Sequence, residues 1–290
     1  MEFFETLLNG LSIGSTYAII ALGYTMVYGI AKMLNFAHGD VIMVGGYMIF
    51  LTMAGIGNPI VGLLAAVLFC VLLGISIEKV AYKPLRGASP LAVLITAIGV
   101  SYLLQSTAQI VFGSAPKMVI VADFGNLTIG ELTIPYYMLI TLACSVVIML
   151  ALSLFVKYTK TGRAMIAVSE DKGAAQLMGI NVNAIIAITF AIGSGLAAFA
   201  GFFMLMKSPS LSNTLGAMPG IKAFTAAVIG GIGSIPGAMV GGILMGVVEA
   251  ISLKIPVIAP YTDAIEFLVL IVILLVRPSG ILGKVRREKV

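Results

Sequence analysis

The chain has 290 residues, of which 60% are hydrophobic and only 10% are charged. A soluble domain carries about a quarter of its residues as charged side chains, so this composition excludes a soluble protein that covers its own surface. The formal net charge of +5 is not concentrated on a polar domain, which argues against nucleic-acid binding and makes it a guide to membrane topology.

Long apolar runs follow one another along the chain, and several approach or exceed the roughly 20 residues that a helix needs to cross a bilayer. They predict an all-α fold, a polytopic membrane helix bundle. In chain order we expect spans at 6–30, 41–55, 60–78, 90–112, 136–156, 184–206 and 262–276. The Gly-rich region 221–253 is broken at Gly233–Pro236 and predicts a re-entrant hairpin or two short crossings. The total is about eight full spans, or nine if the hairpin crosses twice.

Basic residues gather in three regions outside these spans. They are Lys79, Lys83 and Arg86, then Lys157, Lys160, Arg163 and Lys172, and finally Arg277, Lys284, Arg286, Arg287 and Lys289. By the positive-inside rule all three regions face the cytoplasm, which places the N-terminus outside and the C-terminus inside. The stretch 113–135 carries short β-type runs and predicts an extracytoplasmic loop that forms a small cap. We expect residues 1–290 to form a single transmembrane domain.

One long polar segment, a cytoplasmic arm at 157–182, interrupts the apolar spans. Apolar residues recur in it at roughly helical spacing, at Ala164, Val168, Ala175 and Met178. Gly179 is well placed to end the helix as a C-terminal cap. The apolar face of such a helix packs either on its own bundle or in the groove of a soluble partner. For a segment of this length we favour the partner.

Two groups of residues are candidates for a substrate path. The first is Asn35, His38 and Asp40, which form either a polar turn in which Asp40 caps the next helix or the lining of the path, since ionisable groups are costly at membrane depth and often functional there. The second group consists of glycines that interrupt the late helices, Gly230, Gly231 and Gly233.

Three short segments recur in the second half of the chain. Ile13–Ser15 resembles Ile192–Ser194, Val44–Gly46 resembles Ile229–Gly231, and Gly57–Pro59 resembles Gly233–Pro236. In the expected topology the two sets run in opposite directions across the membrane. They indicate an inverted repeat, in which interrupted helices mark the translocation path, or else a coincidence among many glycines.

No motif for catalysis or nucleotide binding is present. The sequence lacks the phosphate-binding Gly-x-x-x-x-Gly-Lys-Ser/Thr and the His-Glu-x-x-His metal motif. The spacing Gly-x-Ser-x-Gly occurs at Gly10–Gly14, inside the apolar span 6–30 and not at the strand-to-helix turn that a nucleophile elbow requires. His38 is the single histidine and has no obvious co-ligand, so we expect no metal site, no cofactor bound by this chain and no enzyme activity. We read Glu249 and Glu266 as carboxylates near helix ends in preference to pathway residues. Gln105 is expected to bond a neighbouring helix.

Four motifs in chain order resemble those of branched-chain amino-acid ABC transporter permeases of the LivH type. They are LNFAHGDVIMVGGY (34–47), TGRAMIAVSEDKGAAQLMGINV (161–182), GIKAFTAAVIGGIGSIPGAMVGG (220–242) and RPSGILGK (277–284). The resemblance extends over the whole chain.

This resemblance implies a permease subunit of an importer in the cytoplasmic membrane of a bacterium or archaeon. The implied partners are a second homologous permease, two ATPase subunits that hydrolyse ATP, and an extracytoplasmic binding protein that delivers leucine, isoleucine or valine. Residues of the arm would couple to an ATPase subunit: Gly162, Arg163, Ala164, Glu170, Asp171, Ala175 and Gly179. Urea or a short amide is the alternative substrate.

A stand-alone secondary transporter is the rival class. Such a protein needs ionisable groups within its spans to couple ions, and these spans are nearly free of them.

Overall fold

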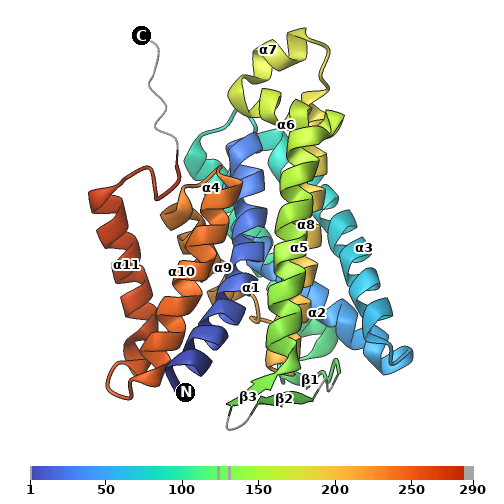
Figure 1. The fold of residues 1–290 in the computed structure, drawn as a ribbon. Coiled ribbons are helices and arrows are strands. Elements are labelled where there is room, and N and C mark those ends of the chain that lie inside the picture. Colours follow the sequence, from blue (N-terminus) through green and yellow to red (C-terminus); the bar gives the residue numbers. More distant parts are fainter. Residues whose placement is uncertain (1, 123–124, 130–131, 284–290) are drawn as a thin grey trace.

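The structure, a computed structural model, describes residues 2–122, 125–129 and 132–283. The basic residues Lys284, Arg286, Arg287 and Lys289 lie outside the described residues. The chain forms one bundle of helices, most of which run along the length of the molecule (Figure 1). The helices are α1 (Glu2–Ala31), α2 (His38–Gly55), α3 (Pro59–Ile77), α4 (Pro90–Phe112), α5 (Tyr136–Tyr158), α6 (Lys160–Glu170), α7 (Lys172–Leu177), α8 (Val182–Lys207), α9 (Ala217–Gly230), α10 (Ile235–Lys254) and α11 (Thr262–Val276). Short π- and 3-10 turns are η1 (Glu78–Tyr82), η2 (Lys83–Leu85) and η3 (Ala259–Tyr261).

The two ends of the bundle differ (Figure 1). One end, which we call the arm end, carries α6 and α7 and the C-terminal end of α11. The opposite end, the sheet end, carries the N-terminus of α1 and the β-strands. Arg86 donates a hydrogen bond to Asn183 at the start of α8, so the basic loop 79–86 also lies at the arm end. Arg277 directly follows α11, so the described basic residues of the three regions share one end of the molecule, as the positive-inside rule requires.

Within the described residues, seven helices are long and apolar enough to cross a membrane: α1, α3, α4, α5, α8, α10 and α11. The expected spans at these positions agree with the structure to within a few residues at most ends. The predicted break near Gly233–Pro236 is confirmed, because α9 ends at Gly230 and α10 begins at Ile235. Helices α2 and α9, with 18 and 14 residues, are not among these seven, and both begin inside the bundle.

Helices α1 and α10 form the most extensive helix pair, and they run antiparallel. Small residues allow their backbones to touch. A Cβ on Gly14 would lie against the backbone of Ile243, and a Cβ on Gly246 would collide with the backbone of Gly14. This seam makes α1 the centre of the bundle, and most of the side chains of α1 beyond Ser12 are buried.

Two small antiparallel sheets form the sheet end. Strands β2 (Asn126–Ile129) and β3 (Leu132–Pro135) form a hairpin within the loop 113–135, where short β-type runs were expected. Strand β1 (Lys117–Met118) pairs with β4 (Ser210–Leu211). The second pairing holds the segment that follows α8 against this loop.

Candidate functional site

Helix α2 starts inside the bundle and not at the arm end where α1 finishes. The ring of His38, its first residue, lies so close to Gly23 of α1 that a Cβ on Gly23 would collide with it. Gly23 is eight residues before the end of α1, or about 12 Å along its axis. The irregular segment 32–37, in which Lys32 has a φ of 59°, therefore turns back into the bundle.

Helix α9 starts inside the bundle in the same manner, from the opposite direction. Helix α8 runs to the sheet end, the segment 208–216 turns back, and α9 then leads to the arm end. The first turns of the two helices meet through glycines: a Cβ on Gly39 would collide with the backbone of Gly216, and Gly220 faces Gly39 as well. We call this meeting point, Gly39 with Gly216 and Gly220, the half-helix junction.

Buried polar side chains surround the α2 side of the junction. Asn35 is 3% exposed, and its Oδ1 accepts a hydrogen bond of 2.9 Å from the hydroxyl of Tyr82 in η1. Asp40 is 2% exposed and accepts a bond of 2.8 Å from Gln105 of α4. The expectation that Gln105 bonds a neighbouring helix is therefore confirmed. His38 packs edge-on against the ring of Tyr24.

The alternative in which Asp40 caps the next helix is wrong. Helix α2 begins two residues earlier, the residue at its N-cap position is Ala37, and no side chain caps it. The carboxylate of Asp40 is directed to Gln105 of α4. A cavity of about 420 Å³ borders these two residues and the first turn of α9. Irregular backbone at membrane depth persists only where protein or a water-filled cavity surrounds it, and the junction lies within the bundle beside this cavity.

The glycines of the second candidate group lie away from this cluster. Gly230 and Gly231 are at the far end of α9, where the backbone NH groups of Ile281 and Leu282 donate to Ile229 and Gly230. Gly231 and Gly233 have φ values of 106° and 94°, which glycine adopts without strain. They let the C-terminal segment pack tightly over the arm end of α9. The structure does not bring them together with Asn35, His38 and Asp40.

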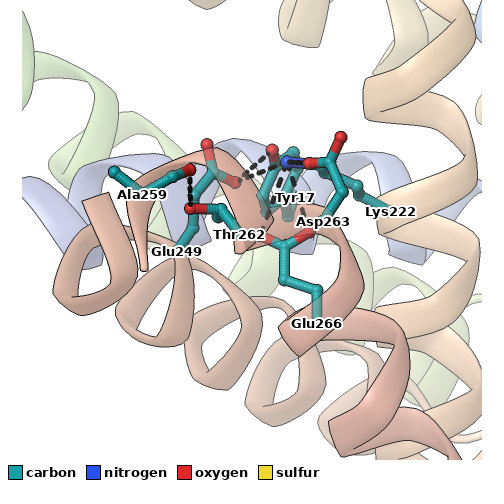
Figure 2. A network of polar contacts seen from close by, with 7 residues as sticks. All are labelled: Tyr17, Lys222, Glu249, Ala259, Thr262, Asp263 and Glu266. Carbon is teal, nitrogen blue, oxygen red and sulfur yellow. Dashed lines mark hydrogen bonds and ion pairs between the residues drawn. The ribbon is translucent and has the colours of Figure 1, made fainter. Parts of the chain in front are cut away.

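A charged network joins four helices nearer the sheet end (Figure 2). Lys222 of α9 lies among three carboxylates, with Nζ–O distances of 2.8 Å to Asp263, 3.2 Å to Glu266 and 3.4 Å to Glu249. Tyr17 of α1 donates a bond of 2.5 Å to Glu249. The side chain of Glu266 is fully buried, and that of Lys222 is 10% exposed. The ammonium group of Lys222 thus connects α9 to α10 and α11, and Tyr17 connects α1 to the same network through Glu249.

Sequence reasoning missed this network. It interpreted Glu249 and Glu266 only as carboxylates near helix ends, and it assigned no role to Lys222. The available signal was Lys222 itself, a lone cation inside the apolar stretch 217–230, which is costly unless paired. Its partners lie 27 to 44 residues away, so no local pattern connects them.

The arm consists of two helices with a sharp break at Asp171. Met165, Val168 and Ala175 face inward and are buried, and Gly162 packs against the backbone of Val156. Ala164 is half-buried. Three of the coupling candidates are exposed to solvent: Arg163 within α6, Glu170 at its last position and Asp171 directly after it.

The apolar positions of the arm are divided between its own bundle and the surface. Ala164, Val168 and Ala175 contribute to the packing of the arm on the chain, whereas Met178 is 82% exposed beside Leu177, which is 90% exposed. Gly179 follows α7 with a φ of 80°, and the NH of Ile180 donates to Ala175. The predicted C-terminal cap is confirmed.

One side chain connects the arm with the end of α1. Lys172, the first residue of α7, donates a bond of 2.8 Å to the carbonyl of Ala31. Burial lowers the pKa of Lys172, and the positive charge of Arg86 nearby lowers it further. A cation at the C-terminus of α1 complements the helix dipole and satisfies a free carbonyl.

Comparison with known proteins identifies the family. The model for "Branched-chain amino acid transport system / permease component" matches residues 6–274. The permease protein BraD of the high-affinity branched-chain amino acid transport system of Pseudomonas aeruginosa is 44% identical over 100% of this chain and 98% of its own length. LivH of Escherichia coli strain K12 is 42% identical over the same shares, and the ribose import permease RbsC of Haemophilus influenzae is 29% identical over 84% of this chain and 77% of its own. With a family match over nearly all of its length, a bundle of apolar helices and an arm at one end, the chain belongs to the branched-chain amino acid transport permease family.

Proposed function

We propose that this chain is a membrane-spanning subunit of an ATP-binding-cassette importer that moves leucine, isoleucine and valine into the cell. The observation that carries the proposal is the similarity to BraD and LivH over the full length of this chain and 98% of theirs. A shared architecture alone does not specify a substrate. An overall identity of 42–44%, in alignments that extend over the whole chain, supports the shared substrate class.

The assembly that we propose contains further subunits. A second homologous permease completes the membrane part, two ATPase subunits hydrolyse ATP at the arm end, and an extracytoplasmic binding protein delivers the amino acid at the sheet end. The protein then lies in the cytoplasmic membrane with its C-terminus inside. The basic loop 79–86, the arm and Arg277 lie at the arm end, which supports this orientation. The chain has no phosphate-binding loop of its own, which supports separate ATPase subunits.

The exposed part of the arm suits an ATPase partner. Leu177 and Met178 project from its tip, and such apolar residues on a polar segment gain by filling a partner's groove. Glu170 and Arg163 lie on the exposed side of α6 and would set the orientation by charge. The apolar residues of α6 that pack on the chain make the arm a rigid lever and not a loose tether.

Movement of the arm has a direct route to the half-helix junction. Lys172 holds Ala31, the last residue of α1, and the following segment 32–37 leads straight to α2. Tyr82 holds that segment at Leu34 and Asn35. In our proposal, closure of the ATPases pulls this segment and changes how the first turns of α2 and α9 meet.

Copurification followed by an ATPase assay tests the proposal. Tagged protein extracted gently from its native membrane should carry ATPase subunits, and leucine-loaded binding protein should raise their hydrolysis. A chain that purifies alone under several mild detergents would contradict an ABC importer and favour a stand-alone transporter. Stimulation by urea, a short amide or ribose, with none by leucine, would keep the importer and replace the substrate.

Charge reversal on the arm tests the docking role separately. Glu170→Lys should lower ATP-driven uptake about tenfold, equivalent to ~1.4 kcal/mol of docking free energy, at an unchanged amount of protein in the membrane. Asp171 is unsuitable for this test, because its side chain caps the start of α7 by accepting hydrogen bonds from the backbone NH groups of Gly173 and Ala174. A substitution there would disturb the helix as well as the charge. Lys117→Glu, a reversal at the sheet end, is the control. Normal uptake by the Glu170→Lys variant would contradict docking through this face.

A further inference from the structure

A cavity of about 240 Å³ lies among α1, α5, α8, α9 and α10. It extends from Leu215 and Pro219, which flank the start of α9, to Lys207 and Ser208 at the sheet end of α8. Pockets for drug-sized ligands have volumes of about 300 to 1,000 Å³, so this cavity suits a smaller solute.

Side chains of opposite charge line the cavity. Lys207 ends α8, and its ammonium has no hydrogen bond or ion pair to any residue in the part of the chain that the structure describes. Glu249 comes from α10, and its side chain is 13% exposed. Tyr17 and Lys222 occupy one oxygen of this carboxylate, and a carboxylate has about four acceptor positions. An additional cationic group can therefore bind to Glu249.

The remaining walls are of two kinds. Ile13, Phe203 and Met204 form an apolar side, and hydroxyl groups such as those of Thr16 and Thr141 line the rest. A site with a few charged groups against an apolar wall holds a ligand of matching polarity in one orientation.

We propose that this cavity binds one zwitterionic α-amino acid with a short aliphatic side chain. Lys207 binds its carboxylate, Glu249 binds its ammonium group, and Phe203 with Ile13 and Met204 encloses its side chain. The choice of an amino acid rests on the proposed function, and the position and the two charged contacts go beyond it.

Other cavities lack this combination or lie along its approach. The cavity beside the half-helix junction has Asp40 and no basic residue, and a cavity at the arm end has Lys32, Arg86 and Lys172 and no acid. A cavity of about 400 Å³ lies along α1, α5 and α10 one to two turns nearer the sheet end. It also has an acid and a base, Glu5 and Lys254, but Lys254 already interacts with another residue. Its position gives an amino acid released at that end a way in.

Equilibrium binding of radiolabelled L-leucine to the full-length chain in lipid nanodiscs tests the proposal. Two competitors each remove one charge from leucine: 4-methylpentanoate lacks the ammonium group, and 3-methylbutylamine lacks the carboxylate. The wild-type chain should bind leucine saturably and each competitor at least about tenfold more weakly.

The decisive variant is Lys207→Met, because Lys207 holds no other described residue in place. It should weaken leucine binding about ten- to hundredfold, the usual effect of losing a hydrogen bond to a charged group, and leave the affinity for 3-methylbutylamine unchanged. Lys117→Met, a neutralised lysine in β1 at the sheet end, should bind leucine as the wild type does. Glu249→Gln should have the reciprocal effect and leave the affinity for 4-methylpentanoate unchanged.

Three outcomes would overturn the proposal: no saturable binding of leucine, unchanged binding by Lys207→Met, or equal binding of leucine and 3-methylbutylamine. Leucine uptake by the complete wild-type assembly is measured in parallel. If uptake is normal while any of these outcomes occurs, the cavity assignment is wrong and the proposed function stands. If the assembly does not transport leucine, the proposed function is wrong as well.

Discussion

The two half-helices α2 and α9 occupy corresponding positions in opposite orientations, and different chemistry holds each of them. A long helix precedes each one, α1 before α2 and α8 before α9, and a turned-back segment leads from each long helix to the junction. Hydrogen bonds hold the α2 side: Tyr82 donates to Asn35, just before the helix, and Gln105 donates to Asp40 in its first turn. In each bond at most one partner is charged. An ionic network around Lys222 holds α9.

This difference indicates which half is anchored. Helix α9 is tied through Lys222 to α10 and α11 and clamped at its other end by the C-terminal segment at Gly230. Helix α2 and the segment before it are held by hydrogen bonds and not by ion pairs. That segment follows Ala31, which is bonded to Lys172 of the arm. We therefore expect α9 to serve as the fixed side of the junction and α2 as the side that moves.

The largest expected effect comes from breaking the anchored half. Lys222→Met leaves three carboxylates without their shared ammonium, and removing one partner of a buried ion pair costs about 3–5 kcal/mol. The free energy of unfolding in detergent micelles should fall by that amount. Lys207→Met, a lysine without a described partner, should change stability by less than ~1 kcal/mol. A loss below ~1 kcal/mol for Lys222→Met would contradict the anchoring role.

A smaller effect is expected where the two halves touch. Gly39→Ala places a methyl group against the carbonyl of Gly216, and overpacking of this kind costs about 1–3 kcal/mol. Gly55→Ala is a matched control on the same helix, because a Cβ there meets nothing within 4 Å. The control should be neutral or slightly stabilising. Equal stability of the two variants, by thermal unfolding, would mean that the half-helices do not meet through these glycines.

Loosening the α2 side should cost less again. Tyr82→Phe removes the donor to Asn35 and Leu34, and leaving such a buried acceptor without its partner costs about 1–2 kcal/mol. Hydrogen exchange of residues 32–37 should rise in this variant, while that of α9 stays unchanged. Tyr158→Phe, at an exposed position, is the control. Faster exchange throughout α9 would argue against two separately held halves.

The smallest effect on stability is expected at the connection to the arm. Lys172→Met removes one bond to Ala31 and should cost about 0.5–1.5 kcal/mol. In the assembled transporter we expect ATP hydrolysis to continue while uptake per ATP falls. Lys160→Met, an exposed lysine at the start of α6, should leave this ratio unchanged. An unchanged ratio in Lys172→Met would contradict the route through the end of α1.

Much of the fold could be predicted from the sequence because it follows from local composition. Apolar runs, the polar arm, the cap at Gly179 and the break before Ile235 each depend on neighbouring residues. Two of the three recurring segments also fall at matching places: Ile13 and Ile192 lie in α1 and α8, and Gly57 and Gly233 lie in the turns after α2 and α9. The third pair lies within α2 but at the end of α9, so it does not mark equivalent positions.

The remainder depends on contacts between distant segments. The hydropathy of 41–55 is the same whether α2 starts at a membrane surface or inside the bundle, and its start at His38 is fixed by Gly23, Gly216 and Gly220. For the same reason, the sequence leaves a helix cap open as one of two roles for Asp40, because its partner Gln105 lies 65 residues away. The cavity between Lys207 and Glu249 likewise exists only after five helices have packed.

Uptake into proteoliposomes tests the central claim most directly. The complete assembly is reconstituted with ATP inside the vesicles and loaded binding protein outside, and uptake of labelled leucine is followed with unlabelled isoleucine, valine or ribose as competitors. The account predicts uptake that requires both ATP and the binding protein and that isoleucine and valine inhibit while ribose does not. Leucine uptake that continues without ATP, or that ribose inhibits as strongly as valine does, would contradict it.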